Sequence, residues 1–274
     1  MSIKKNKLKI ACIQTRSQPD INKNLEKIER LINSAIKKGA KLIATPENSN
    51  IMHPNKNALL KACSNEDNDN FLSRIKSIAK NNSVWILLGS IIVKHSKNKL
   101  MNRSYLINNK GLVSAEYNKI HMFDVNLSSK EIYNESKLYK KGSSLITTKT
   151  PWAVVGLSIC YDLRFPIMYR KLAQAGSKII FIPSAFTKTT GKDHWLTLVK
   201  ARAIENGCFI IAPAQFGRHY KGRETFGNSV IVSPWGKILR NKKNGEGIIM
   251  AELDLNEVER ARNSIPSLRV NNKF

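Results

Sequence analysis

The chain has 274 residues, with 46 Lys and Arg against 20 Asp and Glu, and a formal net charge of +26. A chain of this length buries a large core, so its stability does not depend on a disulfide or a metal. Four scattered cysteines without C-x-x-C or H-x-x-x-H spacing argue against a disulfide framework and against a zinc site.

The cysteine usage and the N-terminal segment indicate the compartment. Unpaired cysteines fit a reducing environment. The basic N-terminus precedes an apolar run too short for a secretory signal, and no apolar run approaches the roughly 20 residues that a membrane span needs. We therefore expect a soluble, cytoplasmic protein without a membrane partner.

The high positive charge raises the question of a nucleic-acid partner, because a basic face releases counterions from phosphate backbones. The lysines are spread along the whole chain, often beside asparagine, and aromatic residues make up only 7%. Proteins that bind nucleic acid usually gather basic residues in a patch or stripe. We expect no specific nucleic-acid partner, and a polyanion-binding basic protein is the alternative outside the enzymes.

Short apolar runs alternate with amphipathic stretches in the first half of the chain. The predicted order is strand, helix, strand, helix, strand and hairpin, over residues 9–15, 21–39, 40–48, 70–82, 83–93 and 102–117. The second half repeats this order over residues 152–160, 167–176, 177–186, 194–207, 208–215 and 227–239. Two such halves predict an α/β fold with two sheets packed face to face and helices outside. We interpret residues 1–274 as a single domain with internal pseudo-twofold symmetry.

Polar side chains follow three of the predicted strands: Glu47, Lys119 and Cys160. Ligands of α/β proteins gather at the carboxyl ends of strands, which favours a shared site. Taken singly, Glu47 is also typical of a helix start, Lys119 of a surface and Cys160 of a core. The other three cysteines lie in apolar or helical segments and are predicted to be structural: Cys12, Cys63 and Cys208.

Together the three residues form a chemically complete set for attack on a carbonyl. A free thiol is mostly protonated at neutral pH and needs a base. Glu47 is the predicted base if burial raises its pKa toward neutrality. Lys119 and the backbone N–H of Tyr161 are predicted to stabilise the oxyanion.

Three segments resemble motifs of the nitrilase superfamily, the carbon–nitrogen hydrolases: ATPEN at Glu47, YNKIHMFDV at Lys119 and SICYDLRFP at Cys160. Their order and spacing also match, and the resemblance runs nearly end to end. It implies the four-layer α-β-β-α sandwich of the nitrilase fold and a catalytic triad of base, oxyanion stabiliser and nucleophile without a cofactor or metal. It also implies that Glu135, in YNES, orients Lys119 or the substrate.

Within the superfamily, CYDLRFP, PSAFTKTTGKDHW and GNSVIVSPWG resemble the Nit branch, most of all the amidases of deaminated glutathione. The resemblance implies a small α-keto acid amide as substrate, a thioester intermediate and release of ammonia. An ω-amidase acting on α-ketoglutaramate is the first alternative. A hydrolase of N-carbamoyl compounds or nitriles with the same fold is the second.

Anionic substrates of this kind require a cation in the pocket. Arg164 is predicted to pair with a substrate carboxylate, and an internal ion pair with Asp162 or another acid is the alternative. Phe186 is predicted to wall the acyl chain, and Thr190 to add a hydroxyl. The polar segment 215–229 predicts a loop near the pocket, whose charged side chains would meet a glycyl carboxylate; these are Arg218, His219 and Arg223. The predicted role of His121 and His194 is structural.

Two segments depart from the family pattern. Residues 123–136 lack the Pro-Gly turn usual in this loop, which leaves the geometry of the substrate loop open. The C-terminal residues 263–274 keep the Ile-Pro element but replace the basic run that usually follows it. In the family this tail helps subunits associate, and we expect a homodimer.

Overall fold

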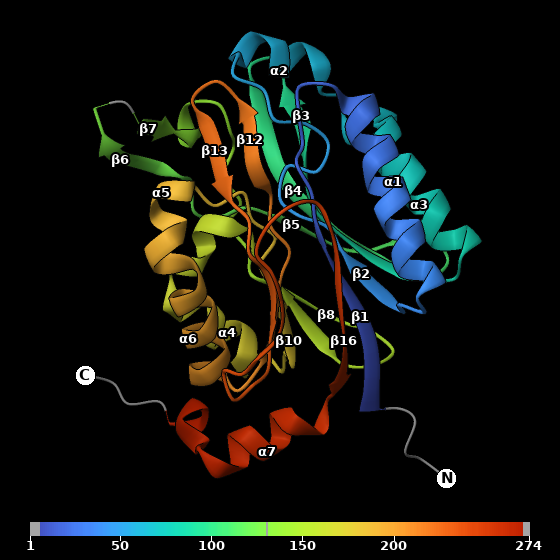
Figure 1. Cartoon of the computed structure of the whole chain (residues 1–274), viewed down its shortest axis with the longest axis vertical. Helices are drawn as coiled ribbons and strands as arrows, with labels where there is room; N and C mark the ends of the chain where they lie inside the picture. The colour runs from blue at the N-terminus through green and yellow to red at the C-terminus, as the bar shows by residue number, and fades with distance from the viewer. Residues whose placement is uncertain (1–5, 130, 271–274) are drawn as a thin grey trace.

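The computed structural model describes residues 6–129 and 131–270. Two six-stranded sheets pack face to face, and helices cover both outer faces (Figure 1). The layers follow one another as helix, sheet, sheet and helix, which confirms the predicted α-β-β-α sandwich. Residues 1–5 and 271–274, which include the basic N-terminus and the end of the tail, lie outside the described residues.

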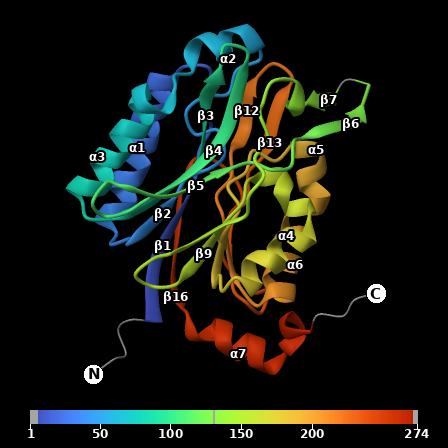
Figure 2. The same ribbon diagram turned by 180° about the vertical axis from the view of Figure 1, so that it is seen from behind.

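The first sheet has the strand order β16-β1-β2-β3-β4-β5. Its strands are β16 (Gly247–Asp254), β1 (Lys7–Gln14), β2 (Leu42–Ala44), β3 (Trp85–Ser96), β4 (Lys99–Ile107) and β5 (Val113–Asn118). Helices α1 (Ile21–Lys37) and α3 (Asn70–Asn81) cover its outer face (Figure 2). Asp20 caps α1 by accepting a hydrogen bond from the N–H of Lys23, and Gly39 follows the helix at φ +83°, a conformation that glycine tolerates best.

The second sheet has the strand order β15-β14-β11-β10-β9-β8. Its strands are β15 (Ile238–Lys242), β14 (Ser229–Val232), β11 (Phe209–Ala212), β10 (Ile179–Phe181), β9 (Val154–Leu157) and β8 (Ile146–Lys149). Helices α4 (Pro166–Gln174) and α6 (Leu196–Asn206) cover its outer face. Both sheets contain three parallel strands with an antiparallel strand on one side and two on the other, which matches the predicted pseudosymmetry.

The parallel strands are buried on both faces, as their near-continuous apolar sequences predict. One core lies between the sheets and under the helices of the second sheet, and another lies between the first sheet and its helices. The predicted hairpin at residues 102–117 is present as β4 and β5, with its turn closed by a hydrogen bond from the N–H of Gly111 to the carbonyl of Asn108.

Several elements were not predicted. In the two sheets these are the edge strands β8 and β16. Outside the sheets they are α2 (Lys56–Ala62), the hairpin of β6 (Asp124–Ser128) and β7 (Glu131–Asn134), the hairpin of β12 (Phe216–Tyr220) and β13 (Arg223–Phe226), and α7 (Asn256–Ser264). The helix predicted from residue 194 begins earlier, with the short α5 (Lys188–Thr190) and a π-helical turn before α6. Figure 1 shows α2 and both hairpins at the same end of the molecule.

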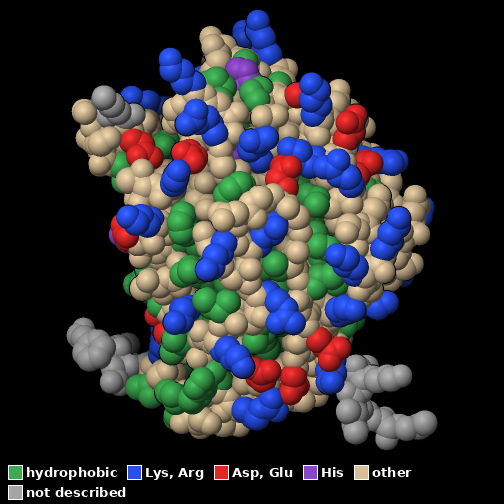
Figure 3. Space-filling model, viewed as in Figure 1, with side chains coloured by type: hydrophobic (Ala, Val, Ile, Leu, Met, Phe, Trp, Pro, Cys, Tyr) green, Lys and Arg blue, Asp and Glu red, His purple; other side chains and the backbone are tan. Residues whose placement is uncertain are grey.

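The surface matches the composition. Lys and Arg are scattered over the face seen in Figure 3, with uncharged side chains between them, and do not gather into one stripe on this face. Within residues 6–129 and 131–270, no helix combines the length and the apolar character that crossing a membrane requires.

Candidate active site

Cys160 lies at a sharp turn between strand β9 and the short helix η4 (Cys160–Arg164). Its φ of +49° is in the left-handed region, which costs energy for a residue other than glycine and persists only where the surroundings hold it. The N–H of Cys160 donates to the carbonyl of Pro183 at 3.0 Å. The thiol lines a cavity although the residue is only 8% exposed.

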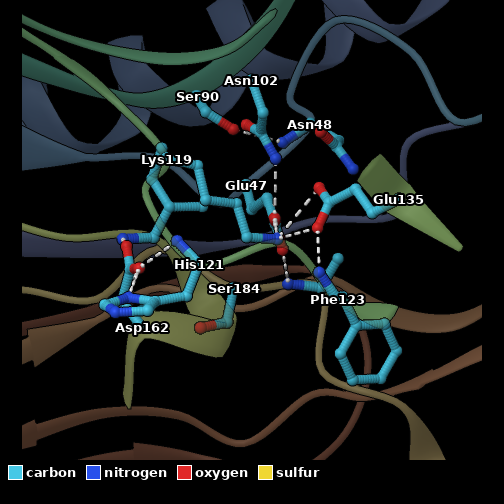
Figure 4. Close-up of polar contacts among 12 residues, drawn as sticks. Glu47, Asn48, Ser90, Asn102, Lys119, His121, Phe123, Glu135, Asp162 and Ser184 are labelled. Atoms are coloured by element: carbon cyan, nitrogen blue, oxygen red, sulfur yellow. Dashed lines mark hydrogen bonds and ion pairs between the residues drawn. The ribbon is translucent and has the colours of Figure 1, made fainter. Parts of the chain in front are cut away.

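Asp162 stabilises this turn through hydrogen bonds. It is fully buried and accepts hydrogen bonds from the N–H of Ile159 at 2.8 Å and from the hydroxyl of Tyr117 at 2.7 Å. It also accepts from the N–H of His121 and contacts its ring Nδ1 at 2.6 Å (Figure 4). Because Tyr117 and His121 flank Lys119, Asp162 ties the cysteine turn to the segment that carries the lysine. His121 is therefore structural, as predicted.

Glu47 reaches the same place from the end of strand β2. The backbone beyond β2 passes very close to Gly89 of β3, where an added Cβ would lie 1.8 Å from the carbonyl oxygen of Thr45. Only glycine permits this approach. The Glu47 carboxylate accepts hydrogen bonds from Asn102 Nδ2 at 2.9 Å and from the N–H of Ala185 at 2.7 Å.

Lys119 follows strand β5 and joins the two glutamates. Its Nζ lies 3.0 Å from Glu47 Oε1 and 2.8 Å from Glu135 Oε2, and Figure 4 shows the ammonium group between the two carboxylates. Glu135 is fixed in turn by the N–H of Phe123, which donates to Oε2 at 2.6 Å. The structure thus brings together all four residues predicted to be catalytic, from four separate segments.

The electrostatics define a resting state. Burial raises the pKa of Glu47, but the charge of Lys119 and hydrogen bonds with Cys160, Lys119 and Ala185 outweigh burial and lower it below 4.5. The expectation that burial moves the pKa of Glu47 toward neutrality is therefore wrong. Burial and the charge of Glu47 raise the pKa of the Cys160 thiol. Burial alone would lower the pKa of Lys119, but the charges of Glu135 and Glu47 outweigh burial and raise this pKa well above its usual value. The resting site therefore holds a charged Lys119 beside the neutral thiol of Cys160 and the ionised carboxylate of Glu47.

The cavity has a volume of about 290 Å³ and lies among β6–β7, α2, β12–β13 and α5. Glu47, Lys119, Glu135 and Cys160 all line it. Its size is near the lower limit for small-molecule sites, about 300 to 1,000 Å³. Among the described residues, no group of three or more His, Cys, Asp or Glu side chains is arranged to hold a metal ion.

Four of the residues predicted to contact the substrate line the cavity: Tyr161, Phe186, Thr190 and Arg223. Arg164 is not among the lining residues. Its guanidinium lies 5.2 Å from the centre of the Phe186 ring and contacts His194 Nδ1 at 3.2 Å, and it forms no ion pair with Asp162 or another acid of the described residues. The structure therefore supports neither interpretation of Arg164.

Of the three charged residues predicted to meet a glycyl carboxylate, Arg223 alone lines the cavity, and Tyr220 of the same segment lines it as well. Its Nη2 donates to the carbonyl of Ala185 at 2.6 Å, and its guanidinium lies 4.9 Å from the centre of the Tyr133 ring. Nη1 is buried without a hydrogen-bond partner among the described residues. Arg218 is exposed outside the cavity, and His219 is buried away from it.

His219 contacts the carbonyl of Ser17 and the hydroxyl of Thr225, both at 2.7 Å. Burial lowers its pKa from 6.5 to about 4. As the pH falls, the imidazole becomes protonated in the unfolded chain before it does so in the folded protein. The contribution of neutral His219 to the free energy of unfolding is therefore complete above pH 6.5 and is lost as the pH falls toward 4. We expect the loss to reach about 3 kcal/mol.

Urea unfolding at pH 6.5 and at pH 4 measures this loss, with His219→Gln as the comparison. The variant should lose less stability than the wild type between the two pH values. Equal losses in the two proteins would contradict the assignment of the buried neutral imidazole.

Sequence reasoning missed other residues at the site. Asn102, which hydrogen-bonds Glu47, reads in the sequence as an ordinary strand residue. Tyr133 and Lys56 also line the cavity and come from elements that were not predicted, and His53 lines it from the loop before α2. The asparagine-rich sequence around α2 and the β6–β7 hairpin has no clear periodicity, so it carries no signal for these positions.

The comparisons with known proteins agree with this geometry. A model of the carbon–nitrogen hydrolase family matches residues 9–263. The chain therefore belongs to the carbon–nitrogen hydrolase family, and it is an amidase-type hydrolase, as the motifs of the nitrilase superfamily predicted.

Its curated relatives narrow the group further. A protein of Synechocystis sp. named deaminated glutathione amidase is 38% identical over 264 residues, which cover 94% of this chain and 96% of the relative. The mouse protein of the same name is 36% identical over 264 residues, which cover 94% of this chain and 81% of the mouse protein. The predicted resemblance to the Nit branch is confirmed.

Solved structures show the same fold. The Caenorhabditis elegans NitFhit protein superposes with a TM-score of 0.91 at 33% identity, over 97% of this chain. The chain spans only 65% of that longer protein. A Saccharomyces cerevisiae protein of branch 10 of the nitrilase superfamily has a TM-score of 0.85 at 28% identity, with 95% of both chains covered.

Proposed function

We propose that this chain hydrolyses deaminated glutathione, the α-keto acid analogue of glutathione, through a thioester on Cys160. The observation that carries the proposal is the cavity, which joins Cys160, Glu47 and Lys119 to Arg223, whose Nη1 has no hydrogen-bond partner among the described residues. An amide substrate with a carboxylate fits this combination. The names of the relatives that match nearly the full chain support the choice of substrate.

The leaving group follows from the chemistry of the substrate. Glutathione loses its only free amino group on deamination, so the remaining nitrogens belong to peptide bonds. Hydrolysis at the γ-carbonyl then releases the dipeptide cysteinylglycine and 2-oxoglutarate. The expected release of ammonia applies only to a primary amide such as α-ketoglutaramate.

In the acylation half-reaction, Cys160 Sγ attacks the amide carbonyl carbon while Glu47 takes the thiol proton. The ammonium of Lys119 and the N–H of Tyr161 stabilise the oxyanion, since N–H groups in the first turn of a helix have no partner within it. The C–N bond then breaks, and Glu47 gives the proton to the departing nitrogen. The acyl group remains on sulfur as a thioester.

In the second half-reaction, water attacks the thioester. Glu47 accepts a proton from water, the C–S bond breaks, and the thiol regains its proton. Glu135 positions Lys119 throughout, because it holds the ammonium by both carboxylate oxygens at 3.0 and 2.8 Å. Phe186 and Thr190 line the acyl side of the cavity.

The proposal is tested by comparing kcat/KM for deaminated glutathione and α-ketoglutaramate. Release of cysteinylglycine and of ammonia, respectively, reports the two reactions. A higher kcat/KM for deaminated glutathione is expected. A higher value for α-ketoglutaramate would move the function to that of an ω-amidase, and activity only on N-carbamoyl compounds or nitriles would refute the proposal.

Arg223 takes over the carboxylate contact that the sequence assigned to Arg164. We expect Arg223→Gln to raise KM about 30-fold with little change in kcat, because a buried charge pair with substrate is lost in both the ground state and the transition state. Steady-state kinetics with deaminated glutathione measure this. Arg164→Gln is the control, and an equal rise in KM in both variants would contradict the assignment.

The homodimer, the cytoplasmic location and the single domain over residues 1–274 remain proposals. An exposed apolar groove supports self-association. It is lined by Ile204, Trp235 and Ile265, which are 54%, 61% and 54% exposed. Surfaces of this kind mark interaction sites. The family match over residues 9–263 supports the single domain.

A further inference from the structure

The active-site cavity is lined by more positively charged than negatively charged side chains. Its lining acids are Glu47 and Glu135, and both are bonded to Lys119. Two further cations line the cavity, Arg223 and Lys56. Neither forms an ion pair with an acid in the described part of the chain. The cavity therefore offers two cations that remain free to bind anions.

The two cations differ in depth. Arg223 donates to the carbonyl of Ala185, whose own N–H donates to Glu47, so its guanidinium lies next to the reacting groups. Lys56 is exposed at the start of helix α2, on the outer part of the cavity. The deeper cation suits the acyl portion, which stays bound through both half-reactions. The outer cation suits the leaving group, which must depart first.

The cavity wall beside Lys56 also fits the leaving group. The apolar side chains Ile51, Leu59 and Leu138 form one cluster and line the cavity on the α2 side. His53 adds a polar group there. Its Nδ1 lies 2.9 Å from the backbone nitrogen of Asn55 and 3.2 Å from the Asn55 carbonyl oxygen. An uncharged thiol side chain against this apolar wall and a carboxylate near Lys56 match a cysteinylglycine unit.

We propose that Lys56 binds the C-terminal carboxylate of the leaving dipeptide and thereby determines the selection of a peptide amide over a primary amide. The inference rests on the proposed function. Deaminated glutathione has two carboxylates, one on each side of the scissile bond, which match Arg223 and Lys56. α-Ketoglutaramate has one carboxylate and releases only ammonia, so it leaves Lys56 without a partner.

The test compares two substrates that differ only in this carboxylate: deaminated glutathione and its C-terminal amide. The wild-type enzyme should prefer the acid about fivefold in kcat/KM, the size expected of a partly solvated ion pair. In Lys56→Gln the acid-to-amide ratio should fall to about one. Lys61→Gln is the matched control, because Lys61 lies on the same helix, is exposed and does not line the cavity, and it should keep the fivefold preference.

Retention of the fivefold preference in Lys56→Gln would overturn the inference. So would an equal loss of activity on the acid and on the amide, since that pattern indicates a structural role. In both cases the proposed function stands, because the wild type cleaves deaminated glutathione. A wild-type enzyme that cleaves α-ketoglutaramate but neither form of deaminated glutathione would refute the proposed function, and the inference with it.

Discussion

Cys160→Ala is expected to lower kcat/KM for deaminated glutathione by at least about 10⁴-fold. The thiol is the nucleophile in the proposed reaction, and the cavity offers no substitute for it. The backbone at Cys160 should remain in place, because alanine keeps the Cβ and the N–H that bonds to the carbonyl of Pro183. The variant should therefore unfold at nearly the wild-type temperature, as measured by circular dichroism.

Cys12→Ala is the matched control for this change. Cys12 is fully buried, but it lies in strand β1 and does not line the cavity. Its loss should reduce stability and leave kcat near the wild-type value. Turnover in Cys160→Ala above about one per cent of the wild type would contradict nucleophilic catalysis, since residual rates after loss of a nucleophile are far lower.

Glu47→Gln is expected to lower kcat by about 10³-fold, the scale of a lost general base. An amide has nearly the same shape as the carboxylate but does not accept the thiol proton. The change also removes the negative charge that raises the pKa of Cys160, so this pKa should fall in the variant. Ultraviolet thiolate absorbance, with Cys160→Ala as the blank, measures the shift.

The pH profile of the wild-type enzyme provides a second measure of Glu47. Catalysis needs the ionised carboxylate, and the pKa of Glu47 lies below 4.5. The acid limb of kcat/KM should therefore lie below pH 4.5, with activity lost as the pH falls through the lowered pKa. An acid limb near neutral pH would contradict the resting state described for the site. Asn102→Asp, which places a second acid against Glu47, should move the limb upward.

The sequence predicted the fold and the triad well because both depend on local patterns. Apolar runs placed the strands of both sheets except the edge strands β8 and β16. Polar residues at three strand ends located Glu47, Lys119 and Cys160 before the family motifs were considered. Glu135 was found only through the resemblance, because an acid in a polar loop has no distinguishing pattern.

The sequence failed where the outcome depends on tertiary contacts. Arg164 is close to Cys160 along the chain, but the η4 turn directs its guanidinium toward Phe186 and His194 instead of the cavity. Burial of Glu47 was foreseen, yet the sign of its pKa shift depends on how close Lys119 lies. Lys56 was one of many lysines, and only the position of α2 places it at the cavity.

The central claim, a thioester on Cys160, is tested most directly by an acid-quenched single turnover of the wild-type enzyme with deaminated glutathione. The account predicts that cysteinylglycine appears before 2-oxoglutarate and that the peptide containing Cys160 carries a 2-oxoglutaryl group at early times. Simultaneous release of both products, with no adduct on that peptide, would indicate direct attack by water and contradict it.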